Sequence, residues 1–279
     1  MMRAKIEQIS EGIYEHIPTE DVIGCLQREH SMLAWAIDGA STLTKAPFTT
    51  YDGLSDAGWF VRRLAKLLRD QFNKTPFCTK KLRRGLQIIL DEYRQATEDA
   101  TPLWAWPVAA AIMVEIDHRA AQTQISFYRY ADCFELVFQG ILLDRSHIAS
   151  PVSQPSYDLW KPFSGFKGQE LARLRQRRCE QQKNQSSTAL TLNPASAMNA
   201  VEEKRTIHTP AHIVLGSDGL SRVWDTYALM TREQAMQLVA QQGLPELLRL
   251  LRDFEASAPT GRANLKRRDD ACGIHIFLA

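Results

Sequence analysis

Residues 31–39 read S-M-L-A-W-A-I-D-G, an apolar run that stops at an aspartate followed by a glycine. A short apolar run of this kind is typical of a buried β-strand, and it places Asp38 at the end of that strand. Because Gly39 lets the backbone approach closely, carboxylate and carbonyl oxygens could both face a hard cation there. A single Asp-Gly pair more often marks only a tight turn, and we interpret Asp52-Gly53 as such a turn.

The same arrangement recurs in the C-terminal half of the chain. Asp218 follows the apolar stretch H-I-V-L-G-S and precedes a glycine, and Asp269 stands just before the last apolar segment. These acids are far apart in the sequence, so they could meet only through the fold. Because three acids lie at strand ends, our hypothesis is that they meet in one site.

The remaining periodicity favours an α+β fold. Helical spacing of apolar residues predicts helices over 55–72, 82–93, 232–242 and 245–256, the first capped by Ser55. Further strands are predicted over 108–116, 123–131, 133–139, 211–216 and 274–278, the first three of these as an antiparallel meander. This order indicates sheets covered by helix pairs rather than a parallel βαβ sheet.

Residues 150–209 differ in composition from the rest, being rich in Ser, Pro, Gln and Asn, and we interpret them as an irregular insertion or flap. A basic helix over 169–182 lies inside it. Its arginines could recognise a phosphoprotein or a nucleic acid, but no aromatic residues alternate with them as base stacking requires. We therefore interpret them as a solvated helix face. They are Arg173, Arg175, Arg177 and Arg178.

Composition excludes several classes of protein. The 279 residues include 34 Lys and Arg against 32 Asp and Glu, so the net charge of +2 is too small for a polycation that binds nucleic acid or membrane. The longest apolar run, Leu103–Val114, is shorter than the ~18–20 residues that span a bilayer, and the first twenty residues contain no apolar signal-peptide core. Five scattered cysteines without a C-x-x-C pair favour a reducing cytoplasm.

Five short segments resemble, in their order along the chain, the motifs of the metal-dependent protein phosphatases of type 2C. They are T-E-D at 19–21, A-I-D-G-A-S at 36–41, Y-A-D-C at 130–133, G-S-D-G-L at 216–220 and R-D-D-A-C-G-I-H-I at 268–276. Each motif alone is weak evidence. Their order along the chain and their positions at predicted strands identify the chain as a divergent, bacterial member of this family. The resemblance extends from Glu20 to Phe277, so it implies one domain over 1–279 with the flap 150–209 inside it.

The family resemblance implies a four-layer αββα sandwich, in which two antiparallel sheets pack face to face and a helix pair covers each outer side. It also implies a site for two Mn²⁺ or Mg²⁺ ions at one end of the sandwich. In that site Asp38 would bridge both ions, the Gly39 carbonyl would add an oxygen, and Asp218 and Asp269 would complete one shell. Glu20 would act on the second ion through water, and Asp21 would orient its neighbours. Asp132 with Asp218 would hold a third, weaker ion.

The activity implied by the resemblance is hydrolysis of phosphoserine and phosphothreonine in a phosphoprotein, opposing a Ser/Thr kinase. Two divalent cations ~3.5–4 Å apart activate a water that attacks phosphorus in line while they neutralise the phosphate oxygens. The expected catalytic residues are Asp38, Asp218, Asp269, Glu20 and His16. We expect a cytoplasmic monomer that binds neither nucleic acid nor membrane.

Departures from the family pattern leave a second function open. His16 stands where members usually carry an arginine that holds the substrate phosphate, and a mostly neutral histidine offers fewer donors. Ala40-Ser41 replaces the usual second glycine, and the bulky Trp106-Pro107 replaces a small segment before the central strand. A pseudophosphatase that binds a ligand or partner is therefore the alternative, and a nucleic-acid-binding module using the basic helix is a third hypothesis.

Overall fold

The protein is described by a computed structural model that covers residues 4–13, 15–43, 53–97, 101–118, 122–140, 165–185, 187–257 and 268–279. The predicted Asp52 turn position and residues 150–164 of the predicted flap lie outside these ranges. The strands are β1 (Ala4–Glu11), β2 (Asp21–Gln27), β3 (Ser31–Gly39), β4 (Val108–Asp117), β5 (Thr123–Tyr130), β6 (Phe134–Gln139), β7 (Leu190–Thr191), β8 (Val201–Ile207), β9 (Ala211–Gly216) and β10 (Ala271–Leu278). The α-helices are α1 (Asp56–Phe72), α2 (Thr79–Ala96), α3 (Gly168–Gln182), α4 (Asp218–Asp225), α5 (Arg232–Gln242) and α6 (Leu244–Ser257), with short 3-10 helices η1 (Leu103–Ala105) and η3 (Pro194–Asn199).

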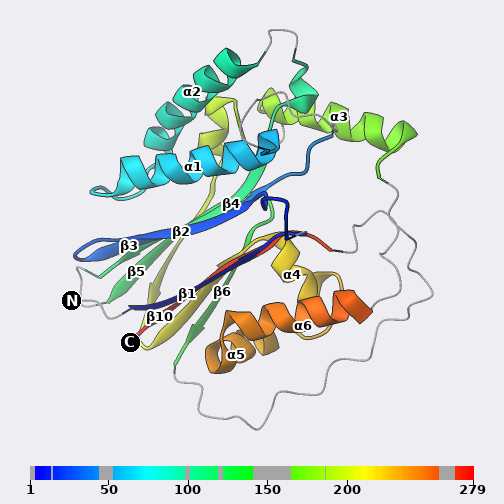
Figure 1. Ribbon diagram of the computed structural model, residues 1–279. Coiled ribbons are helices and arrows are strands. Elements are labelled where there is room, and N and C mark those ends of the chain that lie inside the picture. Colours follow the sequence, from blue (N-terminus) through cyan, green and yellow to red (C-terminus); the bar gives the residue numbers. More distant parts are fainter. Residues whose placement is uncertain are drawn as a thin grey trace.

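The strands form two antiparallel sheets packed face to face (Figure 1). One sheet has the order β2-β3-β4-β5-β8, with β7 pairing to β4, and the other has the order β1-β10-β9-β6. Helices α1 and α2 cover the first sheet, and α5 and α6 cover the second (Figure 1). The predicted αββα sandwich of two antiparallel sheets flanked by helix pairs is therefore confirmed.

Three apolar cores separate these four layers. One lies between α1, α2 and the larger sheet, the second between the two sheets, and the third between the smaller sheet and helices α4, α5 and α6. Strand β3 belongs to two of them, because successive side chains point to opposite faces. Leu33, Trp35 and Ile37 pack toward the helices, whereas Met32, Ala34 and Ala36 pack between the sheets. By the same alternation, Asp38 faces the space between the sheets at the strand end.

Two features differ from the sequence-based prediction. The predicted meander over 108–139 is wrong in its last strand, because β6 leaves β5 and pairs with β9 in the other sheet. The chain changes sheets at Ala131, whose φ of 59° is left-handed. The described part of the predicted irregular flap is also more regular than expected, since β7 and β8 both join the larger sheet.

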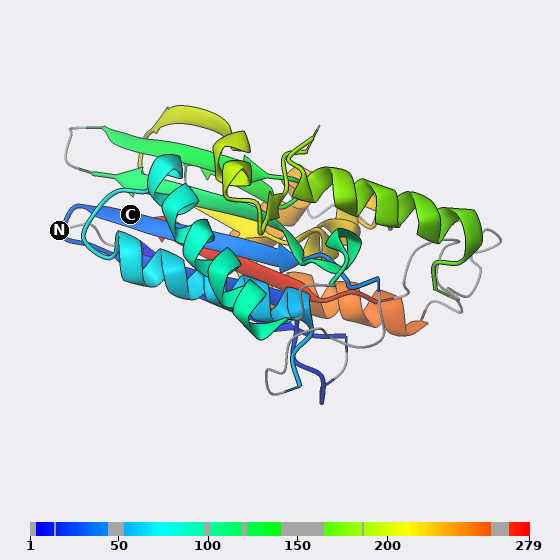
Figure 2. The same cartoon turned by 90° about the horizontal axis from the view of Figure 1, so that it is seen from above.

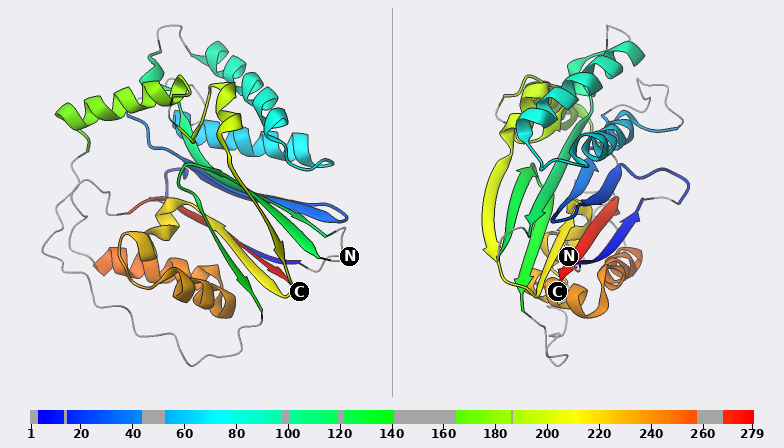
Figure 3. Two further views of the ribbon diagram at one scale, coloured as in Figure 1. Left: turned by 180° about the vertical axis from the view of Figure 1, so that it is seen from behind. Right: turned by 90° about the vertical axis from the view of Figure 1, so that its left-hand side faces the viewer.

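The two ends of the sandwich differ. Both termini lie at one end, and α3 lies at the other, where it extends beyond the sheets (Figures 1 and 2). Figure 3 shows the same separation from behind. Within the described ranges, no helix is long and apolar enough to cross a membrane. The predicted acids lie at the α3 end, at strand and helix ends and in the segments that join them.

Candidate active site

A cavity of about 250 Å³ lies at the α3 end of the sandwich and brings the predicted acids together. Its wall contains every predicted metal ligand: Glu20, Asp38, Gly39, Asp132, Asp218 and Asp269. Asp21 and Asp270 also line it, as do Arg177, Arg178 and Gln181 of α3. The acids come from both halves of the chain, as the sequence predicted.

Asp21 and Asp38 sit opposite each other at the ends of β2 and β3. Like charges in directly opposed positions of an antiparallel pair repel each other. Asp21 is 3% exposed, and burial, with the nearby Asp270 and Asp218, raises its pKa to about 8. Burial and the carboxylates of Asp21 and Asp218 also raise the pKa of Asp38 well above its ordinary value. Ionising both carboxyl groups is therefore costly without a metal, and a bound cation would offset that cost.

Asp218 is placed by the junction of β9 and α4. It begins α4 after Ser217, whose backbone N–H donates to the Cys272 carbonyl of the neighbouring strand. Its carboxyl group hydrogen-bonds that of Asp38, and its pKa is raised, chiefly by burial and by the nearby charges of Asp132 and Asp269. Asp132 follows Ala131 at the corner where the chain changes sheets, so that corner delivers an acid to the cavity.

The glycines after the two aspartates permit close backbone approach. A Cβ on Gly39 would lie 2.8 Å from the Glu20 carbonyl oxygen, and one on Gly219 would lie 1.8 Å from that of Asp270. The Gly39 N–H donates to the same Glu20 carbonyl at 3.0 Å. The Asp-Gly pairs therefore have a packing function as well as a turn function, because they hold the acid-bearing segments against each other.

Gly219→Ala is expected to destabilise the protein by about 2 kcal/mol or more, since the added Cβ meets rigid backbone. Gly58→Ala is the matched control, because Gly58 also lies in the first turn of a helix. There the new Cβ would meet only side-chain atoms, of Arg62 at 3.2 Å and Ser55 at 3.3 Å. Urea unfolding of both variants measures the difference. Equal free energies of unfolding for the two variants would show that the backbone around Asp270 shifts to accommodate the added Cβ at little cost.

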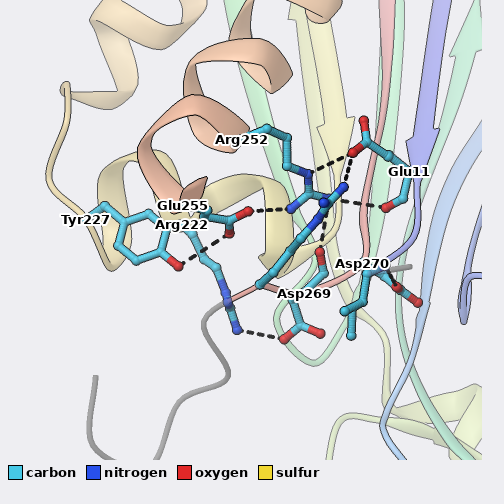
Figure 4. Close-up of polar contacts among 9 residues, drawn as sticks. Glu11, Arg222, Tyr227, Arg252, Glu255, Asp269 and Asp270 are labelled. Carbon is cyan, nitrogen blue, oxygen red and sulfur yellow. Dashed lines mark hydrogen bonds and ion pairs between the residues drawn. The ribbon is translucent and has the colours of Figure 1, made fainter. Parts of the chain in front are cut away.

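The two acids before β10 have different partners (Figure 4). Asp269 accepts a hydrogen bond from Nη2 of the buried Arg222 at 2.6 Å. Asp270 accepts from the backbone N–H groups of Ile13 at 2.8 Å and Glu20 at 2.5 Å. Asp270, which no sequence pattern had singled out, therefore ties the segment before β2 to the start of β10.

The Glu20 side chain is positioned by the start of α1. The Ser55 hydroxyl donates to Glu20 and accepts the N–H of Gly58 at 2.9 Å, so Ser55 caps α1 as predicted and also orients an acid. Arg62 on the next turn of α1 donates to the Thr19 carbonyl at 3.0 Å. Both residues support the T-E-D segment, and neither role was evident from the sequence.

The structure does not place His16 in the cavity wall. Its side chain is exposed, and it does not line the cavity. Arg178 does line the cavity, and it is partly buried there. The interpretation of the α3 arginines as a uniformly solvated face is therefore wrong for this residue, because packing of α3 against the cavity rim turns it inward.

The donor set fits a hard divalent cation in its chemistry. Carboxylate and carbonyl oxygens are the ligands that Mg²⁺ and Mn²⁺ prefer. Oδ2 of Asp21 is buried without a hydrogen-bond partner among the described residues, which is costly unless a charge compensates nearby. Within those residues, however, no group of three or more His, Cys, Asp or Glu side chains is arranged to hold a metal ion as it stands. The Arg222–Asp269 ion pair engages one of the expected donors.

No protein-family model and no curated protein sequence matches the chain. Solved structures do match over its full length. The catalytic domain of the serine/threonine protein phosphatase PstP, in complex with two manganese ions, is 12% identical, with 100% of both chains covered and a TM-score of 0.52. Phosphatase Stp1 from Staphylococcus aureus is 12% identical over 100% of this chain and 96% of its own, with a TM-score of 0.53. The chain has the type 2C phosphatase fold.

The type 2C fold is shared by proteins whose structures contain either metal. RsbX in complex with magnesium is 10% identical, with 100% of both chains covered and a TM-score of 0.50. At these identities the likeness defines the fold, and the chemistry has to be argued from this chain's own residues. In the type 2C fold of this chain, the cavity at the α3 end combines acids from both sheets.

Proposed function

We propose that this protein is a Mn²⁺- or Mg²⁺-dependent phosphatase that hydrolyses phosphoserine and phosphothreonine in a phosphoprotein, opposing a Ser/Thr kinase. The observation that carries the proposal is the convergence of the acids on one cavity at the end of a type 2C sandwich. We further propose that residues 1–279 act as one cytoplasmic, monomeric catalytic domain.

In this proposal the cations are held by the oxygen donors of the cavity wall, namely Glu20, Asp38, Gly39, Asp132, Asp218 and Asp269. Two bound cations would lower the pKa of a water molecule and neutralise the phosphate oxygens. Ser55 and Asp270 hold Glu20 in place through its side chain and its backbone N–H. Asp21, whose pKa is raised in the metal-free protein, would orient the groups beside it.

The test is release of phosphate from an aryl phosphate and from a phosphothreonine peptide. Protein treated with EDTA is expected to be inactive and to regain activity with Mn²⁺, because the acids alone cannot neutralise a phosphate dianion. Calorimetry of Mn²⁺ binding accompanies the assay, so that metal loading is known. A folded protein that binds Mn²⁺ and releases no phosphate from either substrate would contradict the proposal.

A pseudophosphatase that binds a ligand or partner is the second candidate. The Arg222–Asp269 ion pair favours it, because that pair neutralises one expected donor inside the site. The exposed position of His16, which does not line the cavity, favours it as well. The same assay separates the two functions, since a pseudophosphatase would bind a phosphopeptide without turnover.

A further inference from the structure

The basic helix α3 is fixed to the body of the protein beside the cavity. The side-chain amide of Gln182 donates to the carbonyls of Pro107 at 2.8 Å and Trp106 at 3.3 Å. The Arg175 guanidinium lies over the Trp104 ring, 4.0 Å from its centroid. The bulky segment before β4, which departs from the family pattern, therefore serves as the docking surface for α3.

Docking of α3 directs Arg178 into the acid cavity. Its Nη2 donates to the Ser41 carbonyl at 3.2 Å, and the charges of Glu20 and Asp38 are close enough to influence it. Burial lowers the pKa of Arg178 to about 10, against the opposing influence of those two acids, so the side chain remains a cation at neutral pH. A positive charge is thus held at the wall of a mainly acidic cavity.

We propose that Arg178 is the residue that binds the phosphate of the substrate, supplied by α3. This inference rests on the proposed phosphatase function. A guanidinium has five N–H donors in a planar fork that suits bidentate contact with phosphate, and the contact with Ser41 engages one Nη group. His16, the residue at the position where the family pattern predicts a phosphate-binding cation, is exposed and does not line the cavity.

A different role for Arg178 makes opposite predictions. If the guanidinium only compensates the carboxylates, it competes with divalent cations for the same site. Removing it would then tighten Mn²⁺ binding and leave the affinity for phosphate unchanged. If Arg178 binds phosphate, its removal weakens phosphate binding by the Mn²⁺-loaded protein.

The experiment measures binding of inorganic phosphate to Mn²⁺-loaded protein by calorimetry, alongside KM and kcat for a phosphothreonine peptide. Arg178→Ala is expected to weaken phosphate binding by about tenfold or more and to raise KM more than it lowers kcat. Arg178→Lys keeps the charge and should recover part of the affinity. Arg173→Ala is the matched control, because Arg173 lies on the same helix, exposed and outside the cavity wall, and it should leave both quantities unchanged.

Each outcome bears on the inference. Unchanged phosphate affinity in Arg178→Ala, or tighter Mn²⁺ binding with unchanged phosphate affinity, would overturn it, as would wild-type protein that binds no phosphate. If Arg178→Ala does not fold, judged by circular dichroism, Arg178→Gln takes its place. Wild-type protein that binds phosphate through Arg178 but shows no turnover would refute the phosphatase proposal and leave the inference standing.

Discussion

Asp38→Asn is expected to reduce Mn²⁺-dependent phosphate release by more than about a hundredfold, since loss of outer-shell partners of metal ligands alone typically costs about 10–100-fold. The structural reason is its position. Asp38 lies at the end of β3, faces Asp21 across the strand pair and hydrogen-bonds Asp218. Mn²⁺ affinity, measured by calorimetry, should fall together with activity.

The same variant is expected to make the metal-free protein more stable. Asparagine cannot ionise, so it removes the cost of burying an ionisable carboxyl group beside Asp21 and Asp218, and it retains hydrogen-bonding capacity. Lower activity combined with a higher urea midpoint in EDTA is the signature of a site built for a cation. Asp253→Asn serves as the control, because Asp253 lies exposed on α6, pairs with Arg249 and does not line the cavity. Unchanged activity in Asp38→Asn would remove Asp38 from the proposed mechanism.

The stability of the metal-free protein should fall between pH 6.5 and pH 8. The pKa of Asp21 is about 8 in the folded protein and near its ordinary value of 3.8 when unfolded. Between these values the folded state holds more protons, so raising the pH favours unfolding. Over this window the loss should be about 2 kcal/mol, at ~1.4 kcal/mol per pKa unit.

Two comparisons test the source of this pH dependence. In urea unfolding with EDTA, the free energy of unfolding should change less with pH for Asp21→Asn than for wild type. Asp91→Asn, on the exposed side of α2, should behave as wild type. Saturating Mn²⁺ should also flatten the wild-type dependence, because nearby positive charge favours the ionised carboxyl. The window stops at pH 6.5 because burial lowers the pKa of His275 to about 4, so buried histidines oppose the trend at lower pH. A metal-free protein whose stability is constant or rises over the window would contradict the argument.

Much of the site could be predicted because its acids follow strong local signals. The apolar runs of β3 and β9 end abruptly at Asp38 and Asp218, and a strand end is a place that sequence patterns locate well. The convergence of these acids was inferred from the order of the motifs. The structure brings them to one cavity, and it adds Asp270, whose partners are backbone N–H groups and therefore leave no trace in side-chain patterns.

What could not be predicted depends on contacts made by tertiary packing. Strand β8 reads V-E-E-K-R-T-I and resembles a solvated segment, but at the sheet edge Glu203 pairs with Arg129 and Arg205. Charged side chains are common on edge strands because they discourage further pairing. The inward position of Arg178 likewise follows from the docking of α3 on Trp104 and Pro107, which a one-dimensional pattern does not encode.

The position of β10 has a consequence for protein synthesis. This strand lies between β1 and β9, and Asp270 just before it secures the backbone of Ile13 and Glu20. The chain is synthesised from its N-terminus, so β1 cannot pair with β10 until residues 271–278 have been synthesised. Contacts between residues so distant in sequence form slowly. The acid cavity therefore assembles only after Asp269, Asp270 and β10 have been synthesised, and a nascent chain that lacks them has an incomplete cavity wall.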